Sequence, residues 1–166
     1  MEIEVVRGTI VAMPVQVLVT AANSALVGGG GVDGVIHRVA GPELLAALRP
    51  LAPCPPGDAV ITPAFRLPDP VRHVVHAVGP RYGVDEPAGE LLQSASHAAL
   101  RRCDEVGASS VAFPALSTGA FHYPLWDACR LSIDALISAT TSVTSCVLVA
   151  FDGKTERFWH RALSAR

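Results

Sequence analysis

The sequence lacks the features that mark nucleic-acid-binding, membrane-bound or secreted proteins. Charged residues make up 17% of the 166 residues and the formal net charge is -2, so the chain has no basic field to attract a nucleic-acid backbone. No apolar run is long enough to cross a bilayer, and the first residues resemble no secretory signal. We therefore expect a cytoplasmic protein with no membrane partner and no nucleic-acid partner.

Metal and redox motifs are also lacking. The four cysteines are scattered and form no CxxC pair, so we expect free, mostly buried thiols. His73 and His76 lie three residues apart in an expected strand, which sends them to opposite faces and argues against a shared metal. We predict no metal site and no cofactor.

Hydrophobic residues, by contrast, make up 50% of the chain, which favours a single domain over residues 1–166. Strands and helices are expected to alternate along it, which predicts an α/β fold, a three-layer α/β/α sandwich with ligands at the carboxyl ends of the strands. The expected strands are Ile3–Ile10, Val15–Thr20, Ala59–Thr62, His73–Val78, Ser110–Pro114 and Cys146–Phe151. The expected helices are Val32–Val39, Glu43–Leu48, Leu91–Val106, Pro124–Ala139 and Thr155–Leu163.

A run of four glycines, Gly28–Gly31, joins an expected strand to an expected helix. Ordering such a run costs conformational entropy, so an ordered run of glycines needs a reason. One such reason is that bare N–H groups must approach an anion at the N-terminus of the helix. The alternative is a flexible surface loop. Gly29, Gly31 and Gly34 also fit a GxGxxG dinucleotide pattern, but eight residues, Ala21 to Gly28, separate this pattern from the strand, and no acid follows at the ribose-binding spacing.

A second loop, Pro114–Pro124, again leads from a buried strand to a helix. Its small residues offer N–H and hydroxyl donors to phosphate, and Phe121 and Tyr123 offer ring faces to a sugar or base. Alternatively, the loop is a turn whose aromatic residues belong to the core. Two such loops at one sheet edge indicate a diphosphate held from two sides, as in a nucleotide diphosphate-sugar site.

Four segments resemble the motifs of the macrodomain family, in the family's order, and within it the hydrolytic MacroD-type branch. They are Asn23 in Ala-Ala-Asn, Gly28–His37, His76–Pro80 and Phe113–Gly119, and the resemblance extends from Gly8 to Phe151. It implies a central mixed sheet and, as partner, ADP-ribose or an ADP-ribosylated protein. The substrate-binding residues it implies are Thr9, Ile10, Ala22, Asn23, Gly30, Gly31, Val32, Asp33, Ser117, Thr118, Gly119, Ala120, Phe121 and Phe151.

The resemblance also implies roles. Gly31, Val32 and the loop Ser117–Phe121 would hold the diphosphate, with Phe121 near the distal ribose. Phe151 would pack on adenine, unless it is an ordinary core residue, and Asp152 would either touch the adenosine or be an exposed loop acid.

Asn23 and Asp33 are the expected catalytic residues, because Asn23 would bind the distal ribose and Asp33 would lie beside its anomeric end. Lost hydration and a neighbouring diphosphate should raise the pKa of Asp33 towards the range of a general base. Alternatively, Asp33 is a helix N-terminal acid stabilised by the macrodipole, and the ligand phosphate itself holds the attacking water.

The sequence departs from the family at three positions. Thr9 replaces the aspartate that accepts a hydrogen bond from adenine, Thr20 replaces the first asparagine of Asn-Ala-Ala-Asn, and His122 replaces a glycine. No Ser-His-Asp or Cys-His arrangement is evident. The implied activity is removal of mono-ADP-ribose from acidic side chains, or of acetyl from O-acetyl-ADP-ribose. The alternatives are an ADP-ribose reader without turnover and an ADP-ribose-1''-phosphate phosphatase.

Overall fold

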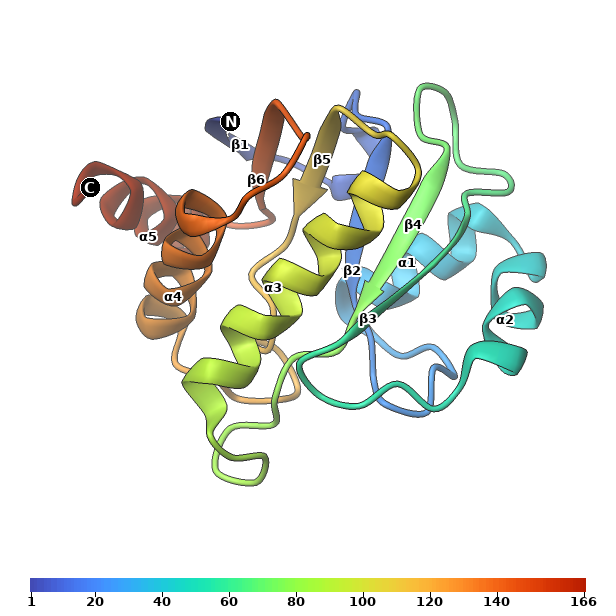
Figure 1. Cartoon of the computed structure of the whole chain (residues 1–166), viewed down its shortest axis with the longest axis horizontal. Coiled ribbons are helices and arrows are strands. Elements are labelled where there is room, and N and C mark those ends of the chain that lie inside the picture. Colours follow the sequence, from blue (N-terminus) through green and yellow to red (C-terminus); the bar gives the residue numbers. More distant parts are fainter.

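The computed structural model describes residues 1–166 and contains one six-stranded sheet between two layers of helices (Figure 1). The order of the strands is β1-β6-β5-β2-β4-β3. All neighbours are parallel except β3, which runs antiparallel to β4, so the predicted mixed sheet is confirmed. The strands are β1 (Glu2–Arg7), β2 (Val17–Ala21), β3 (Ala59–Pro63), β4 (His73–Ala77), β5 (Ser110–Phe113) and β6 (Ser145–Ala150).

Helices cover both faces of the sheet, which confirms the three-layer α/β/α sandwich. Helices α3 (Ala88–Glu105), α4 (Leu125–Ser138) and α5 (Gly153–Ser164) pack against one another and on one face. Helices α1 (Gly31–Ala40) and α2 (Glu43–Leu48) pack on the other face (Figure 1). Two short 3-10 turns, at Ile10–Ala12 and Arg49–Leu51, complete the structure. None of these helices combines the length and the apolar character needed to span a bilayer.

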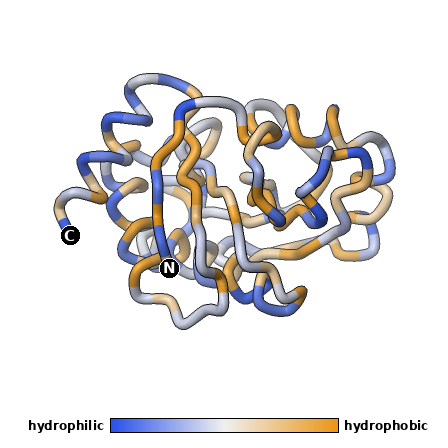
Figure 2. Tube along the Cα trace, turned by 90° about the horizontal axis from the view of Figure 1, so that it is seen from above, coloured by the Kyte–Doolittle hydropathy of each residue, from blue (hydrophilic) through white to orange (hydrophobic).

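The sheet separates two hydrophobic cores, because alternate residues of each strand point to opposite faces. In β4, Val75 joins the cluster beneath α3, α4 and α5, whereas Val74 joins the cluster beneath α1 and α2. Both side chains are fully buried, as expected for a strand covered on both sides. In α5, hydrophilic and hydrophobic stretches alternate along the trace (Figure 2), as expected for a helix with one buried face.

The four cysteines are free and buried, which confirms the expectation. Burial raises the pKa of the Cys54 thiol to about 11 and that of Cys103, Cys129 and Cys146 to about 12. Each is therefore a neutral core residue rather than a thiolate nucleophile.

The strand predicted over Ile3–Ile10 is too long, because β1 ends at Arg7. The partner strand β6 ends at Ala150, whose carbonyl accepts the Gly8 N–H at 2.9 Å, so no strand remains for the chain to pair with. The following residues turn into the 3-10 segment Ile10–Ala12, which buries Ile10. Phe151 follows the last residue of β6 and is 72% exposed, so its interpretation as a core residue is wrong.

Candidate functional site

The largest cleft lies where four adjacent parallel strands end. Strands β1, β6, β5 and β2 are neighbours and run in one direction, so the segments that follow them meet at one edge of the sheet. These segments enclose a cleft of about 1180 Å³. This is the position at which open α/β sheets bind ligands.

Every residue proposed from the sequence as substrate-binding or catalytic lines this one cleft. Sequence reasoning missed Lys154, the only lysine of the chain, which lines the same cleft from the first turn of α5. No motif singled it out, because its position depends on where α5 begins. The predicted residues lining the cleft are Thr9, Ile10, Ala22, Asn23, Gly30, Gly31, Val32, Asp33, Ser117, Thr118, Gly119, Ala120, Phe121 and Phe151.

The glycine run forms an ordered turn into α1. The Asn23 amide donates to the Gly28 carbonyl at 2.9 Å, and its oxygen accepts the Val27 N–H at 3.3 Å. Gly30 caps α1, and Gly31 has a φ of 57°, a value that favours glycine. These contacts argue against the flexible-loop alternative and commit part of the Asn23 amide to holding the turn.

The same turn presents free backbone donors to the cleft. The N–H groups of Gly31, Val32 and Asp33 open α1 and have no backbone partner. A Cβ added at Gly30 or Gly31 would meet no atom within 4 Å, so the space in front of these groups is open. The positive end of the helix dipole adds to an anion-binding surface here.

Gly34 fixes the turn against α1, because a Cβ there would lie 2.8 Å from the Gly29 carbonyl oxygen. We expect Gly34→Ala to lower the free energy of unfolding by about 1–3 kcal/mol, the usual cost of overpacking. The matched control is Gly89→Ala in α3, where the nearest side-chain atom would be 3.6 Å away. Thermal melting of both variants checks this expectation, and equal melting temperatures would contradict it.

The second loop offers backbone donors rather than hydroxyl donors. The Thr118 hydroxyl donates to the Ala115 carbonyl at 2.8 Å. The Ser117 hydroxyl is buried against Gly79, so the expectation that hydroxyls of this loop face a phosphate is wrong for both residues. The Thr118 hydroxyl thus braces the loop, the Ser117 hydroxyl has no hydrogen-bond partner, and the N–H groups of Thr118–Phe121 have no backbone partner.

The two aromatic residues of this loop have different environments. Tyr123 is buried in the hydrophobic cluster beneath α3, α4 and α5, in agreement with its interpretation as a core residue. It also lines part of the cleft. Phe121 is half-buried and lines the cleft. His122, between them, has a φ of 61°, a left-handed conformation in which glycine carries no steric penalty. An exposed imidazole therefore occupies a position with glycine-like geometry at the mouth of the cleft.

At the β6 end of the cleft, Phe151 presents an exposed ring and Asp152 caps α5. The Asp152 carboxylate accepts the Thr155 N–H at 2.8 Å. Hydrogen bonding from Thr155 lowers the pKa of Asp152, so this acid is ionised. Its observed role is that of a helix cap.

Asp33 is a buried acid at the opposite end of the cleft. It is 4% exposed, and its Oδ1 accepts a hydrogen bond from the Thr20 hydroxyl at 2.9 Å. Burial raises the pKa of the Asp33 carboxyl, while the Thr20 hydrogen bond and the nearby His37 imidazole oppose that rise. Thr20, a departure from the family pattern, thus provides the hydrogen bond that holds Asp33 in place.

Behind Asp33, two histidines approach its carboxylate. His37 Nε2, one turn further along α1, lies 3.6 Å from Asp33 Oδ1, and His76 extends from β4. Asp33, His37 and His76 place one metal-ligand atom each within 4.8 Å of one another. Sequence reasoning considered only His73 with His76 and missed this group, because its members come from two elements that the fold brings together.

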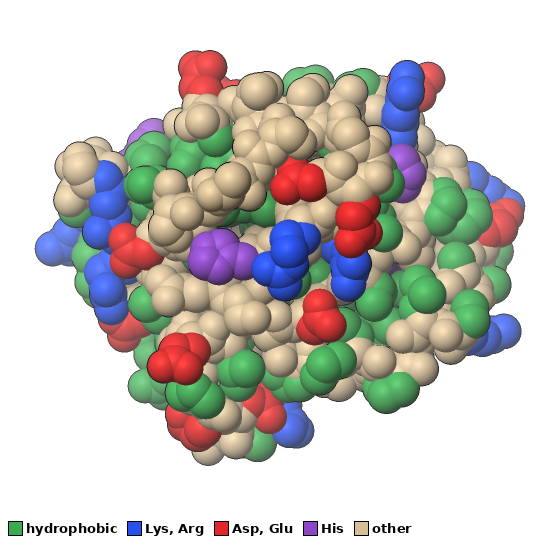
Figure 3. Space-filling view, viewed as in Figure 1, with side chains coloured by type: hydrophobic (Ala, Val, Ile, Leu, Met, Phe, Trp, Pro, Cys, Tyr) green, Lys and Arg blue, Asp and Glu red, His purple; other side chains and the backbone are tan.

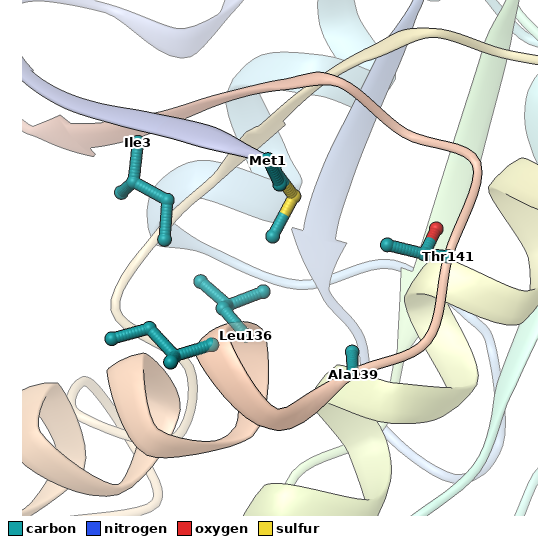
Figure 4. A pocket seen from close by; sticks show the side chains of 6 residues that line it. Met1, Ile3, Leu136, Ala139 and Thr141 are labelled. Atoms are coloured by element: carbon teal, nitrogen blue, oxygen red, sulfur yellow. The ribbon is translucent and has the colours of Figure 1, made fainter.

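Other surfaces offer less chemistry. A second hollow of about 160 Å³ lies between β1 and the end of α4, where the Met1, Ile3 and Leu136 side chains converge (Figure 4). Its lining contains no charged side chain. On the face towards the viewer in Figure 1, acidic and basic side chains are interspersed rather than segregated (Figure 3).

Comparison with known proteins identifies the class of protein. The family model described as Macro domain matches residues 19–132. A macro domain-containing protein of Lactiplantibacillus plantarum is 44% identical over 99% of this chain and 97% of its own length. A protein of Enterobacter cloacae named O-acetyl-ADP-ribose deacetylase is 41% identical over 99% of this chain and 95% of its own length.

Solved structures agree with the sequence comparison. A mutant of the Oceanobacillus iheyensis macrodomain with ADPR is similar with a TM-score of 0.92 and 33% identity, over 98% of this chain and 92% of that chain. The chain therefore belongs to the macrodomain family, as the sequence motifs predicted.

Proposed function

We propose that this macrodomain binds ADP-ribose and hydrolyses the acetyl ester of O-acetyl-ADP-ribose or the ester that links mono-ADP-ribose to acidic side chains. The observation that carries the proposal is the pair of loops with free backbone N–H groups, at Gly31–Asp33 and Thr118–Phe121, that line one cleft containing a buried acid. Relatives named O-acetyl-ADP-ribose deacetylase and neighbours solved with ADPR or ADP support the ligand class.

In this proposal the diphosphate lies between the two loops. Adenine packs on the exposed Phe151 ring, with Thr9 and Ile10 lining the same cleft. The distal ribose lies near Asn23, Asp33 and Phe121. Backbone amides are suited to this task because they donate to phosphate oxygens without the conformational entropy cost of ordering long side chains.

Asp33 acts as the group that orients or deprotonates the attacking water. A carboxylate whose pKa is raised by burial is a stronger proton acceptor than the carboxylate of an ordinary aspartate. In the ester of an acidic side chain or of an acetyl group, water adds to the electrophilic carbon and loses a proton to Asp33, and Asp33 returns that proton to the leaving oxygen as the ester bond breaks.

The test is calorimetric titration with ADP-ribose, with ADP and NAD as comparators, followed by the time course of ADP-ribose or acetate release. We expect micromolar binding and progressive release. Binding with a flat time course on both esters would favour the reader alternative. Release of phosphate from ADP-ribose-1''-phosphate alone would favour the phosphatase alternative.

Thr20 should set the pH at which the hydrolase works. We expect Thr20→Val to shift the acidic limb of the profile of kcat/KM against pH to higher pH, because the Thr20 hydroxyl lowers the pKa of Asp33 and its loss lets that pKa rise further. Thr20→Ser, which keeps the hydroxyl, is the matched control. An unchanged acidic limb in Thr20→Val would mean that Asp33 does not titrate in the reaction.

A further inference from the structure

The Asp33–His37–His76 group has the composition of a metal site. Two imidazoles and one carboxylate are the ligands that Zn²⁺ and similar borderline transition ions prefer, whereas Mg²⁺ and Ca²⁺ require mostly oxygen ligands. We propose that a divalent transition-metal ion, Zn²⁺ or a chemically similar ion, binds between Asp33, His37 and His76, behind the cleft.

Two ligand atoms in this group lack any hydrogen-bond partner although they are buried. They are His37 Nε2 and His76 Nδ1. His76 is completely buried, and buried polar atoms are rarely left without a partner. One ligand atom from each of the three residues lies within 4.8 Å of the others, so a cation bound among them would balance the buried negative charge and give the unpaired nitrogens a partner.

The ligands are already held by neighbouring hydroxyl groups. Thr62 Oγ1 lies 2.9 Å from His76 Nε2, and with Nε2–H donating to it Nδ1 is the nitrogen that keeps a lone pair for a metal ion. The Thr20 hydroxyl donates to Asp33 Oδ1 at 2.9 Å. Such outer hydrogen bonds orient the ligands of natural metal sites and fix the histidine tautomer.

The spacing requires only local side-chain movement. Zinc bonds of about 2.0–2.2 Å place tetrahedral ligand atoms about 3.4 Å apart. Asp33 Oδ1 and His37 Nε2 are 3.6 Å apart, and all three ligand atoms lie within 4.8 Å. Asp33 and His37 are four residues apart on α1 and hence on one face, so rotation of the 17% exposed His37 side chain can close the gap.

The position of the ion determines its effect on the proposed hydrolase, and this step depends on the proposed function. Asp33 lines the cleft, whereas His37 and His76 do not. The ion would therefore bind the carboxylate from behind and compete with water for its lone pairs. We infer that Zn²⁺ inhibits turnover by occupying Asp33 and that it is not required for catalysis.

The binding test needs no substrate and so stands apart from the proposed function. Untagged, chelator-treated protein is titrated with Zn²⁺ by calorimetry and with Co²⁺ by absorption spectroscopy. We expect one Zn²⁺ per chain with a Kd of micromolar or below, and Co²⁺ bands of nitrogen and oxygen coordination without thiolate charge transfer. Weaker or non-stoichiometric Zn²⁺ binding, or a thiolate signature from the four cysteines, would overturn the proposal.

Matched histidine variants locate the site. His76→Gln and His37→Gln should each weaken Zn²⁺ binding at least about a hundredfold, since loss of one of three protein ligands removes a major share of the affinity. His73→Gln, on the same strand as His76, and His160→Gln, on the exposed side of α5, should bind Zn²⁺ as the wild type does.

Circular dichroism shows which variants are folded. If the buried His76→Gln variant does not fold, the partly exposed His37→Gln variant decides the question. Wild-type affinity in a folded His37→Gln variant would refute the site. In the wild type, turnover should fall over the same Zn²⁺ concentrations that fill the site, and Zn²⁺ binding without a fall in turnover would refute the inhibitory role alone.

Discussion

Gly30→Glu and Gly119→Glu should each weaken ADP-ribose binding at least about a hundredfold. Both positions line the cleft, and a Cβ added at either meets no atom within 4 Å, so the new side chain extends into open space. Neither residue has a positive φ, so the substitutions introduce no backbone strain. A carboxylate about 4 Å from a phosphate costs about 4 kcal/mol at an effective dielectric of about 20, which is more than a hundredfold in Kd.

The neutral variants Gly30→Gln and Gly119→Gln separate the effect of charge from that of size. We expect them to bind better than the glutamate variants, and the difference should shrink at high salt because screening weakens the repulsion. Calorimetric titration with ADP-ribose measures all four. Wild-type affinity in either glutamate variant would mean that the diphosphate does not touch that loop.

The sequence predicted the fold and the location of the cleft because both depend on local patterns. Strand and helix periodicities gave the alternating order, and segments that follow parallel strands necessarily meet at one edge of the sheet. The family motifs placed Asp33 and Phe121 in one cleft for this reason. Strand ends were less predictable, since they depend on tertiary pairing: β1 and β6 end together at the paired residues Arg7 and Ala150.

The sequence did not allow us to predict which atoms the side chains of the site contact. Thr118 looked like a phosphate donor until its hydroxyl was found on the Ala115 carbonyl. Thr20 stands where the family has an asparagine, so the sequence indicated only the loss of an amide. In the structure, the Thr20 hydroxyl on β2 donates to Asp33 on α1, and the glycine run lies between these two elements in the sequence. His76 meets Asp33 and His37 only because β4 lies beside β2 in the sheet. Each of these contacts joins residues whose relation is tertiary, and no spacing rule along the chain encodes it.

Asp33→Ala and Asp33→Asn should lower the turnover of the ester substrates at least about tenfold, and ADP-ribose binding should survive. A positioned acid–base group contributes about 10²–10⁴-fold to rate, while the backbone amides that hold the diphosphate remain in place. Single-turnover release of ADP-ribose, together with calorimetry, separates the two effects. Asp127→Asn, in an acid of α4 whose side chain is 48% exposed, is the matched control and should keep wild-type turnover.

The same Asp33→Asn variant should also melt at a higher temperature than the wild type at neutral pH. Because burial raises the pKa of Asp33 in the folded state, the native carboxyl holds its proton more tightly than the unfolded one, and its ionised form costs stability above the native pKa. Asparagine removes that cost and can still accept the Thr20 hydrogen bond. The gain in melting temperature should shrink as the pH falls through the native pKa.

Melting and turnover together decide what Asp33 does. If Asp33 served mainly as a helix N-terminal acid, its charge would stabilise α1, and Asp33→Asn would melt lower while turnover stayed unchanged. A variant that melts higher and turns over slower identifies a carboxylate kept buried at a cost in stability. That combination is expected of a catalytic residue. An acid whose ionisation lowers the stability of the folded state has no structural benefit, so its presence is explained by its role in the reaction.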